Sequence, residues 1–405
     1  MIWFSIIIPV ALTLFFYFNF KKQIVWWELF LSTAASLLVI VSVYEISIHS
    51  KESDVQYKGD LIVRAEYYES WETWVTQECH KTVCDEEDKN GHCTSSHTEY
   101  YDCSYCDYNR EYYVAYLTDG SSVSISSKKF YELKARWGGT WEFHDQDRDI
   151  DFRGTCGKDG DMYSIKWNGD PKTSEPYTWI ASYENRVQAA QSTFNYRELS
   201  DKRYLYEYPE VFDQFHQVTV LGIDSLNLPL SEKERILKRF EYLNGYYGPK
   251  KKVRVYVCLF YKPSQTYAIN QEILWKGGNQ NEIVVCIGVD RNTLELQWVK
   301  PFGWCSNKRV DVNLRENIME QEKLNLDSVY SIVEQEILQN YHVTIFKEKF
   351  AYLQVKPSGT AIIISFILTF IISLGINIWM IQNEFTEASP GGSGGLNFKS
   401  RYGRY

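Results

Sequence analysis

The sequence predicts a membrane-anchored chain of mixed α/β class, with three transmembrane helices, a disulfide-stapled strand-rich region and an α/β domain. Three observations carry this prediction. The chain has three long segments that are almost free of charge. Five of its nine cysteines lie between Cys79 and Cys106. Its second half alternates strand and helix patterns, which is typical of a sheet covered by helices.

The first 48 residues are expected to form a transmembrane hairpin. Residues 1–20 carry no charged side chain, and residues 24–48 are charged only at Glu28 and Glu45, near their two ends. A span needs about 20 apolar residues. One competing interpretation is a cleaved signal peptide, but the basic start and the small-residue cleavage site of such peptides are missing. The other is a buried core helix, although a soluble core rarely needs two such segments in succession.

The topology prediction depends on Lys21 and Lys22, which lie in the short turn between the two spans. An excess of lysine and arginine in short loops marks the cytoplasmic side. Residues 50–357 would then be extracytoplasmic. A third uncharged span over residues 360–381 would return the chain to the cytoplasm, where the glycine-rich, basic tail over residues 382–405 would lie. The chain is therefore expected to be a multi-pass protein of the cell (inner or plasma) membrane, with the lipid bilayer as a partner.

The region between the membrane segments is expected to form two domains, an aromatic, cysteine-rich, strand-rich one over residues 50–205 and an α/β one over residues 206–356. The first is expected to contain three strands, a hairpin and a helix that begins at Ser126 or Ser127 and ends at Trp137. The strands are predicted over 61–66, 162–167 and 177–183, and the hairpin over 111–126.

In the second domain a helix is predicted from Ser231, with Glu234 completing a capping box and with Gly245 and Gly248 ending it. Strand and helix patterns then alternate. Strands are predicted over 252–261, 282–289 and 294–298, and helices over 264–275 and 314–340, the latter broken near 324–327. Residues 342–355 are expected to lead back to the membrane as a strand or extended chain.

The cysteine-rich stretch over residues 78–110 has few aliphatic side chains and needs cross-links to fold. An oxidising compartment favours disulfides. The disulfide candidates are Cys79, Cys84, Cys93, Cys103, Cys106 and Cys156. The competing interpretation is structural zinc, because three histidines are interleaved and Cys103 and Cys106 form a CxxC pair. A second CxxC is missing, so structural zinc in this cluster is disfavoured.

Other polar groups give weaker signals. The acidic run over Asp145–Asp151 suggests calcium, but an EF-hand loop starting there would have Ile150 where glycine is needed and Cys156 where glutamate is needed. A solvated acidic loop is the favoured interpretation. The polar residues Glu184, Asn185, Arg186 and Gln188 are expected to form a buried network or a helix start. Cys258 and Cys286, within apolar strands, are expected to be buried and inert.

The formal net charge of −9 argues against nucleic acid as a partner, because binding to phosphates needs clustered lysine and arginine. Aromatic residues make up 16% of the chain, with 31 tyrosines and 13 tryptophans, and such surfaces favour protein contact. No catalytic or nucleotide-binding motif occurs. We therefore expect a role in binding or envelope assembly, without a cofactor, rather than catalysis.

Residues 252–289 resemble the TPM domain family. The resemblance rests on a strand, a helix ending in Leu274-Trp275-Lys276, a Gly-Asn turn over 277–281 and the strand EIVVCIGV. It covers roughly residues 231–340, and the C-terminal span and Gly391–Gly395 match the layout of many members. The resemblance implies a small α/β fold and, as an alternative function, a metal-dependent phosphatase or hydrolase. The acidic residues tied to metal in some members have no motif-level match here.

Residues 182–188 and the cysteine-rich region are also similar to uncharacterised membrane proteins of bacteria and large phages, which implies no function. The two functional hypotheses predict different surfaces. Carboxylates clustered at the mouth of the α/β sheet would favour the hydrolase, and an apolar patch or a bare sheet edge would favour binding.

Overall fold

The structure is a computed structural model that describes residues 2–19, 26–138, 140–146, 156–190, 196, 198–210 and 214–382. Lys21, Lys22 and the C-terminal tail lie outside the described residues, as do residues 147–151 of the acidic run. Contacts divide the chain into two compact units. The first comprises Met1–Val55, Ser182–Arg197 and Ile345–Tyr405, and the second comprises Gln56–Ala181 and Glu198–Thr344. The two domains expected over residues 50–205 and 206–356 thus both fall mainly in the second unit.

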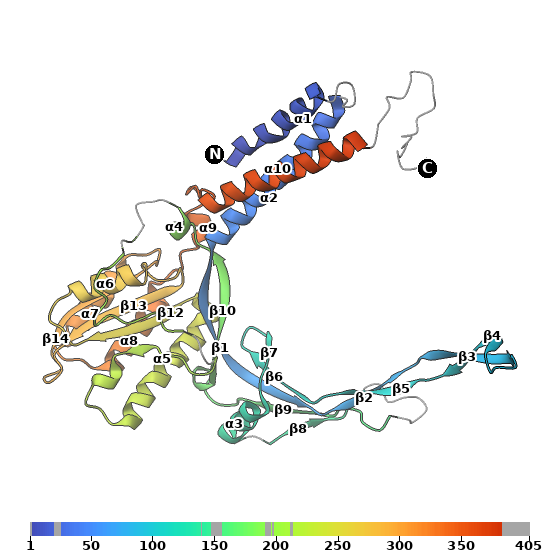
Figure 1. Cartoon of the computed structure of the whole chain (residues 1–405). Helices are drawn as coiled ribbons and strands as arrows, with labels where there is room; N and C mark the ends of the chain where they lie inside the picture. Colours follow the sequence, from blue (N-terminus) through green and yellow to red (C-terminus); the bar gives the residue numbers. More distant parts are fainter. Residues whose placement is uncertain are drawn as a thin grey trace. The chain divides into compact units, whose positions relative to one another are not determined.

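Three apolar helices dominate the first unit (Figure 1). They are α1 (Ile7–Asn19), which continues the short helix η1 (Ile2–Ile6), α2 (Trp26–Glu52) and α10 (Gly359–Gln382). Within them Ile2–Asn19, Phe30–Glu52 and Gly359–Met380 are long and apolar enough to cross a membrane. The prediction of three such helices is confirmed. Two short helices, α4 (Arg186–Ala189) and α9 (Phe346–Lys349), also belong to this unit.

Hydroxyl groups lie between the three long helices. The Ser5 and Ser365 hydroxyl oxygens are 3.1 Å apart, and those of Ser36 and Ser373 are 2.9 Å apart. Asn377 is fully buried and donates from Nδ2 to the Ser373 carbonyl oxygen at 2.7 Å. The two serine pairs connect α10 to the other two helices, whereas the Asn377 bond lies within α10. Sequence inspection, which singled out only the terminal Glu28 and Glu45, did not identify this polar seam.

The second unit contains a six-stranded sheet in the order β7-β6-β1-β9-β8, with β10 also paired to β1. Its strands are β1 (Ser53–Tyr68), β6 (Tyr112–Leu117), β7 (Ser122–Ser124), β8 (Glu142–His144), β9 (Met162–Lys166) and β10 (Glu175–Glu184). β1 pairs antiparallel with both β6 and β9. The helix α3 (Ser127–Trp137) covers the sheet and contributes Phe130 and Leu133 to its core.

The α3 prediction is confirmed in detail. Ser126 is the N-cap, and its hydroxyl oxygen accepts a hydrogen bond from the Lys129 amide. Gly138 ends the helix in the left-handed conformation, with φ of 63°. The strand prediction at 61–66 identified only part of β1, which is 16 residues long. Its charged and tyrosine side chains hide the strand from a hydrophobic pattern.

A second, four-stranded sheet has the order β11-β12-β13-β14. β11 (Val220–Leu221), β12 (Arg254–Phe260) and β13 (Glu282–Val289) are parallel, and β14 (Leu296–Gly303) is antiparallel to β13. Every residue of β12 and β13 is buried. The prediction of central strands at these positions is therefore confirmed, and so is the mixed α/β class.

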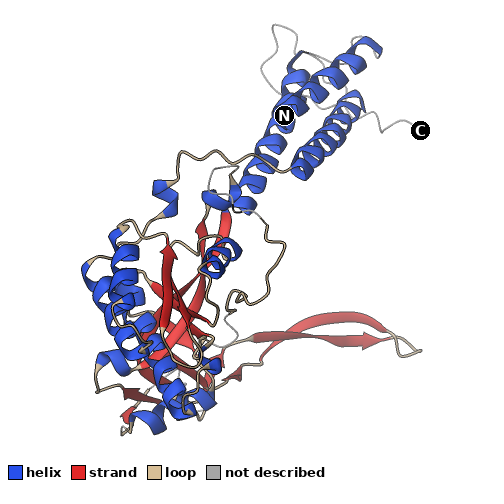
Figure 2. Cartoon of the chain, turned by 90° about the vertical axis from the view of Figure 1, so that its left-hand side faces the viewer, coloured by secondary structure: helices blue, strands red, loops and turns tan. Residues whose placement is uncertain are grey.

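Helices cover both faces of this sheet (Figure 2). Val255, Val257 and Leu259 face a core shared with α5 (Leu230–Lys251), α7 (Arg309–Met319) and α8 (Leu326–Gln339). Tyr256 and Cys258 face a core shared with α6 (Thr266–Leu274). Alternate residues of a strand point to opposite faces, so a continuous apolar run serves both cores. Short helices η2 (Pro171–Thr173) and η3 (Ile223–Ser225) complete the unit.

Two predictions about α5 are wrong. The helix has Pro229 as its N-cap with no side-chain capping bond, so Ser231 and Glu234 form no capping box. It also continues through Gly245 and Gly248 to Lys251. These glycines are packing positions rather than stop signals.

The backbones of α5 and β1 come into direct contact at glycine residues. A Cβ atom placed on Gly248 would lie 2.4 Å from the Gly59 carbonyl oxygen, and one on Gly59 would lie 2.6 Å from the Asn244 carbonyl oxygen. A Cβ on Gly245 would lie 2.5 Å from a Leu61 methyl group. Only hydrogen fits at these three positions, and the contact joins α5 of the second sheet's helical layer to the central strand of the first sheet.

We expect Gly248→Ala to destabilise the protein by about 1–3 kcal/mol, the usual cost of forcing an extra group into a packed interface. Helix propensity alone predicts the opposite sign, because alanine is favoured over glycine by about 1 kcal/mol in a helix. Thermal unfolding of the full chain in detergent measures the sign. Gly157→Ala is the control, since nothing lies within 4 Å of a Cβ there. A raised Tm for Gly248→Ala would contradict the close-contact interpretation.

The cysteine-rich stretch forms two successive two-stranded ribbons rather than a loop. β2 (Trp71–Val75) pairs with β5 (Tyr105–Asn109), and β3 (Glu78–Glu87) pairs with β4 (Cys93–Asp102). No residue of β3 or β4 is buried. Figure 1 shows the first ribbon continuing into the second.

Candidate functional site

The disulfide pairing follows the two ribbons. Cys79 bonds to Cys103 and Cys84 to Cys93, with Cα–Cα distances of 5.7 Å in both pairs. Both bonds tie β3 to β4 or to the residue that follows β4. All six candidate cysteines are in disulfides in this structure, so none offers the thiolate that a zinc site of these residues would require.

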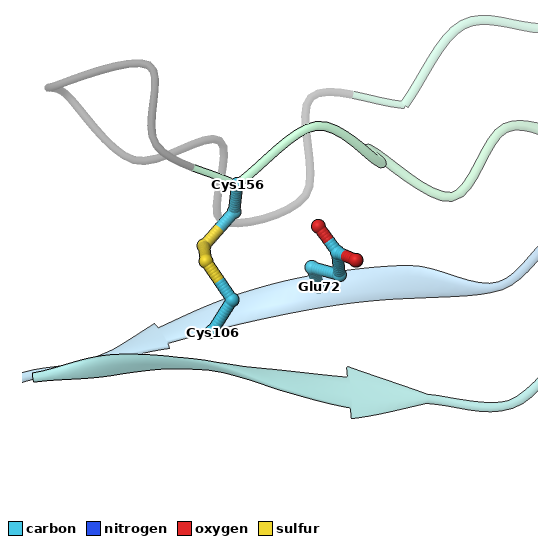
Figure 3. A group of neighbouring side chains, drawn as sticks. All are labelled: Glu72, Cys106 and Cys156. Atoms are coloured by element: carbon cyan, nitrogen blue, oxygen red, sulfur yellow. A yellow bond between two sulfur atoms is a disulfide. The ribbon is translucent and has the colours of Figure 1, made fainter.

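The third disulfide joins Cys106, on β5, to Cys156, with a Cα–Cα distance of 5.8 Å (Figure 3). Cys156 is buried, and the Glu72 carboxylate lies beside the bond. Glu72 accepts a hydrogen bond from the Gly157 amide at 3.0 Å, which ties this segment to β2. Because both sulfur atoms are in the disulfide, this group is a structural cross-link and not a metal centre.

Asp145, Asp159 and Asp161 each place a carboxylate oxygen within 4.8 Å of the others. Asp161 Oδ1 also accepts the Gln146 amide at 3.2 Å. Of the run considered for calcium, only Asp145 and Gln146 lie among the described residues. The partners of Asp145 come instead from the segment before β9.

The parallel strands of the second sheet have their carboxyl ends at one edge, which is where α/β sheets commonly bind ligands. A groove of about 420 Å³ lies there, lined by the chain that follows β11 and β13 and by the first turns of α5 and α8. Its apolar lining consists of Leu226, Leu228, Ile236, Leu294, Leu324 and Leu326.

The acidic side chain of Asp327, on the rim of this groove, is paired with two arginines. Arg235 donates to the Asp327 carboxylate at 2.9 and 2.7 Å, and Arg239 donates to it as well. These hydrogen bonds, that of Arg235 foremost, hold the pKa of Asp327 below its usual range. Within the described part of the chain, no group of three metal-binding carboxylates lies at this edge. Six polar and six apolar residues line the groove, so the mouth of the sheet is mixed in character.

The amino ends of β12 and β13 carry a buried polar centre. Glu282 is fully buried, and its carboxylate accepts hydrogen bonds from the Asn279 amide at 2.8 Å and from the Tyr208 hydroxyl. Burial raises the pKa of the Glu282 carboxyl, while the bond from Tyr208 opposes that rise. Arg254, in register with Glu282, is only 1% exposed. Its guanidinium donates to Tyr256, Gln217 and Thr178 at 2.7, 2.6 and 3.4 Å.

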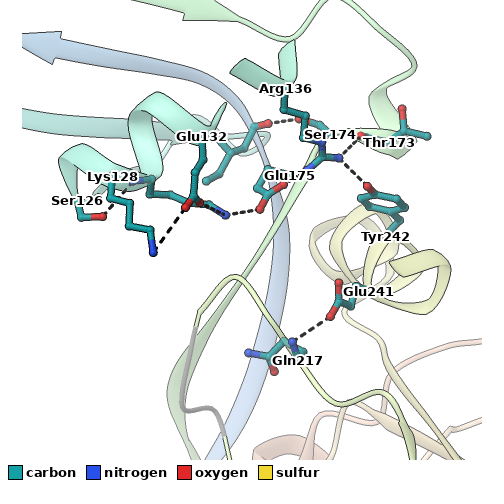
Figure 4. Close-up of polar contacts among 12 residues, drawn as sticks. Ser126, Lys128, Glu132, Arg136, Thr173, Ser174, Glu175, Gln217, Glu241 and Tyr242 are labelled. Carbon is teal, nitrogen blue, oxygen red and sulfur yellow. Dashed lines mark hydrogen bonds and ion pairs between the residues drawn. The ribbon is translucent and has the colours of Figure 1, made fainter. Parts of the chain in front are cut away.

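A second buried charge cluster lies between α3, β10 and α5 (Figure 4). Lys129 donates to Glu175 at 2.5 Å, and Arg136 donates to the same carboxylate. Arg136 also donates to the Tyr242 hydroxyl at 2.6 Å. These contacts border a cavity of about 160 Å³ that also contains Glu241. The charges of Lys129 and Arg136 neutralise the Glu175 carboxylate. The cluster therefore holds α3 against β10.

The Glu241 carboxylate accepts a hydrogen bond from the backbone amide of Gln217 at 3.0 Å. Burial raises the pKa of its carboxyl, and the Gln217 hydrogen bond and the charge of His216 oppose the rise. The chemistry of a catalytic acid would need a reacting group beside it. The cavity lining supplies no serine, threonine or cysteine nucleophile.

We expect Glu241→Gln to stabilise the protein in a pH-dependent manner. An acid with a raised folded-state pKa costs nothing while both states are protonated, and its full cost appears once pH exceeds the folded pKa. The Tm gain of the variant should therefore be absent near pH 4 and should grow as the pH rises toward 7. Glu320→Gln, an exposed site, is the control and should show no such trend. A pH-independent difference for Glu241→Gln would contradict this assignment.

The polar group around Arg186 is a network within the first unit, as expected. Asn185 caps α4 through its side-chain oxygen and donates from Nδ2 to Asp54 at 2.7 Å. Arg186 donates to Glu184 at 2.7 Å and lies 3.3 Å from Glu52. The backbone amide of Gln188 donates a hydrogen bond to the Asn185 side-chain oxygen. Each polar group has a structural partner.

Cys258, Cys286 and Cys305 are buried free thiols. Burial raises the pKa of the Cys258 thiol well above its ordinary value, which keeps it protonated and unreactive. Sequence reasoning missed Arg254, Glu282, Glu175 and Glu241. A signal existed for the first two, because each is a lone charged residue at the start of an otherwise apolar strand.

Comparisons of the chain with protein families, with curated proteins and with solved structures found no match.

We expect the Cys84→Ser/Cys93→Ser double variant to loosen β3 and β4 without destabilising the rest of the unit. The reason is that no residue of these strands is buried, so the ribbon contributes no core to the sheet. Limited proteolysis should cleave the variant within residues 85–92 much faster than the parent chain, with the Tm unchanged. Cys106→Ser/Cys156→Ser, which removes a cross-link anchored at the buried Cys156, should lower the Tm. A similar Tm loss in both variants would contradict this division.

Proposed function

We propose that this chain is a multi-pass membrane protein of the cell (inner or plasma) membrane whose second unit lies outside the cytoplasm. Three apolar helices of sufficient length support the membrane assignment. Three disulfides within residues 79–156 support an oxidising location for the second unit. The lysine pair at residues 21 and 22 supports the orientation.

We further propose that the second unit acts by binding a protein partner, in a role such as envelope assembly. The observation that carries this proposal is the ribbon of β3 and β4, in which disulfides stiffen two strands that bury nothing. Such a ribbon adds no core, so its rigidity serves contact with something else. Exposed tyrosines on the two ribbons suit a binding surface.

A TPM-type metal-dependent hydrolase is the alternative function. The order β12, α6, β13 fits the small α/β fold that this resemblance implies. At the carboxyl edge, however, leucine side chains line the groove and two arginines occupy Asp327. Among the described residues this edge has no cluster of carboxylates, which is the feature that would favour the hydrolase by the criterion set out from the sequence.

Thiol labelling in intact cells tests the location. We expect Cys79, Cys84, Cys93 and Cys103 to react with a membrane-impermeant maleimide only after treatment with an impermeant reductant, because they are bonded in pairs. Mass spectrometry should then return the pairs 79–103 and 84–93. A cysteine introduced by Gln23→Cys should label only after permeabilisation.

Either of two labelling results would contradict the proposed location. Labelling of residue 23 from outside, or cysteines of the ribbon that are free and inaccessible in intact cells, would invert the topology and remove the extracytoplasmic assignment.

A further inference from the structure

The outer arm, defined as residues 78–102, is an unpartnered sheet. β3 and β4 form a two-stranded sheet of their own, so each strand has one open edge. All ten residues of β4 are exposed. Open edges attract non-specific pairing unless charge protects them. The arm is also held in one shape by the Cys84–Cys93 and Cys79–Cys103 bonds.

The outer arm carries a large excess of negative charge. It contains seven carboxylates and two lysines, a formal charge of −5 out of −9 for the whole chain. The carboxylates belong to Glu78, Asp85, Glu86, Glu87, Asp88, Glu99 and Asp102. A surface with such a charge selects partners of the opposite charge and speeds their association.

Several of these carboxylates are already engaged within the arm. Lys81 lies 2.9 Å from Glu99, His97 lies 2.6 Å from Asp85, and Asp88 accepts backbone amides of its own turn. In the described structure, the carboxylates of Glu78, Glu86 and Glu87 have no hydrogen bond or ion pair. These three charges are therefore available to a partner.

Aromatic side chains accompany the charge. Tyr100 is 64% exposed and Tyr101 is 48% exposed, both on β4. Tyr105 and Tyr108, on the adjoining β5, are also exposed. Exposed tyrosines supply contact area and hydrogen bonds at little entropic cost, and their rings attract cations.

We propose that the outer arm is the docking surface for a basic segment of a protein partner, with the free glutamates pairing its lysine or arginine side chains and the tyrosines packing on it. This inference rests on the proposed binding function and names the partner's chemistry. A second copy of the arm is a poor occupant because the like charges repel. A metal ion is a poor occupant too, since the groups of converging ligands among the described residues lie elsewhere.

The first test uses full-length protein in neutral-lipid nanodiscs and a fluorescent oligolysine peptide, with oligoglutamate as its counterpart. Glu78→Gln/Glu86→Gln/Glu87→Gln removes the three free charges. Glu234→Gln/Glu320→Gln/Glu348→Gln is the matched control, since these exposed glutamates also lack partners and the net charge changes equally. We expect the arm variant to bind oligolysine about tenfold more weakly than the parent, and the control to be little changed.

The result is decisive in either direction. An equal loss in both variants would show that only overall charge matters and would overturn the inference. Binding of oligoglutamate as tight as that of oligolysine would do the same.

The second test identifies the natural occupant. A photo-cross-linking residue replaces Tyr100 in the native membrane, and the control replaces the exposed Tyr131 of α3. We expect a cross-link at position 100, absent at 131, to a partner segment rich in lysine or arginine. A cross-link to an acidic or neutral segment, or to a second copy of this chain, would overturn the basic-partner inference while leaving the binding function standing. No cross-link above the control would overturn both.

Discussion

The buried guanidinium of Arg254 joins the two sheets of the second unit. It is 1% exposed and donates to Thr178 on β10, to Tyr256 on its own strand and to Gln217. The ring of Tyr57, from β1, lies 5.4 Å from it. A buried cation is costly unless its donors are satisfied, so the strands that supply these acceptors are constrained to stay together. The Gly248–Gly59 contact and the hydrogen bond from Arg136 to Tyr242 of α5 reinforce the same junction.

The ribbon of β3 and β4 is stabilised in a different way from the two sheets. The sheets are held by buried residues, whereas the outer arm buries none and is held by covalent bonds. A segment without a core cannot balance the entropy of ordering its chain by apolar burial. Cross-links close short loops and reduce that entropy in the unfolded state. This frees every side chain of the arm for the surface, which is why charge and tyrosine, rather than leucine and valine, fill it.

Three glutamates of the second unit that are buried or partly buried are engaged in polar clusters. Glu282, Glu175 and Glu241 all lie in polar clusters whose other members are tyrosine, lysine, arginine or backbone amides. A groove at the carboxyl edge of the parallel strands is lined by leucines, one isoleucine and polar side chains. These features fit the proposed binding role.

The sequence by itself determined the features that depend on local pattern. Uncharged length predicts the three apolar helices, continuous apolar runs predict β12 and β13, and Ser126 with Gly138 marks both ends of α3. The concentration of cysteines also marks the segment that needs cross-links. Each of these signals is carried by neighbouring residues, so it can be found without knowing the fold.

The tertiary structure decided what depends on distant residues. The disulfide pairing of Cys106 with Cys156 spans 50 positions, and nothing in the spacing selects it. In the sequence, Gly245 and Gly248 resemble the glycines that end helices. In the structure, β1 packs closely against them and both lie within α5. Arg254 resembles an exposed strand start until Thr178 and Gln217 enclose it. In each case the deciding partner is remote in sequence, and only folding brings it into contact.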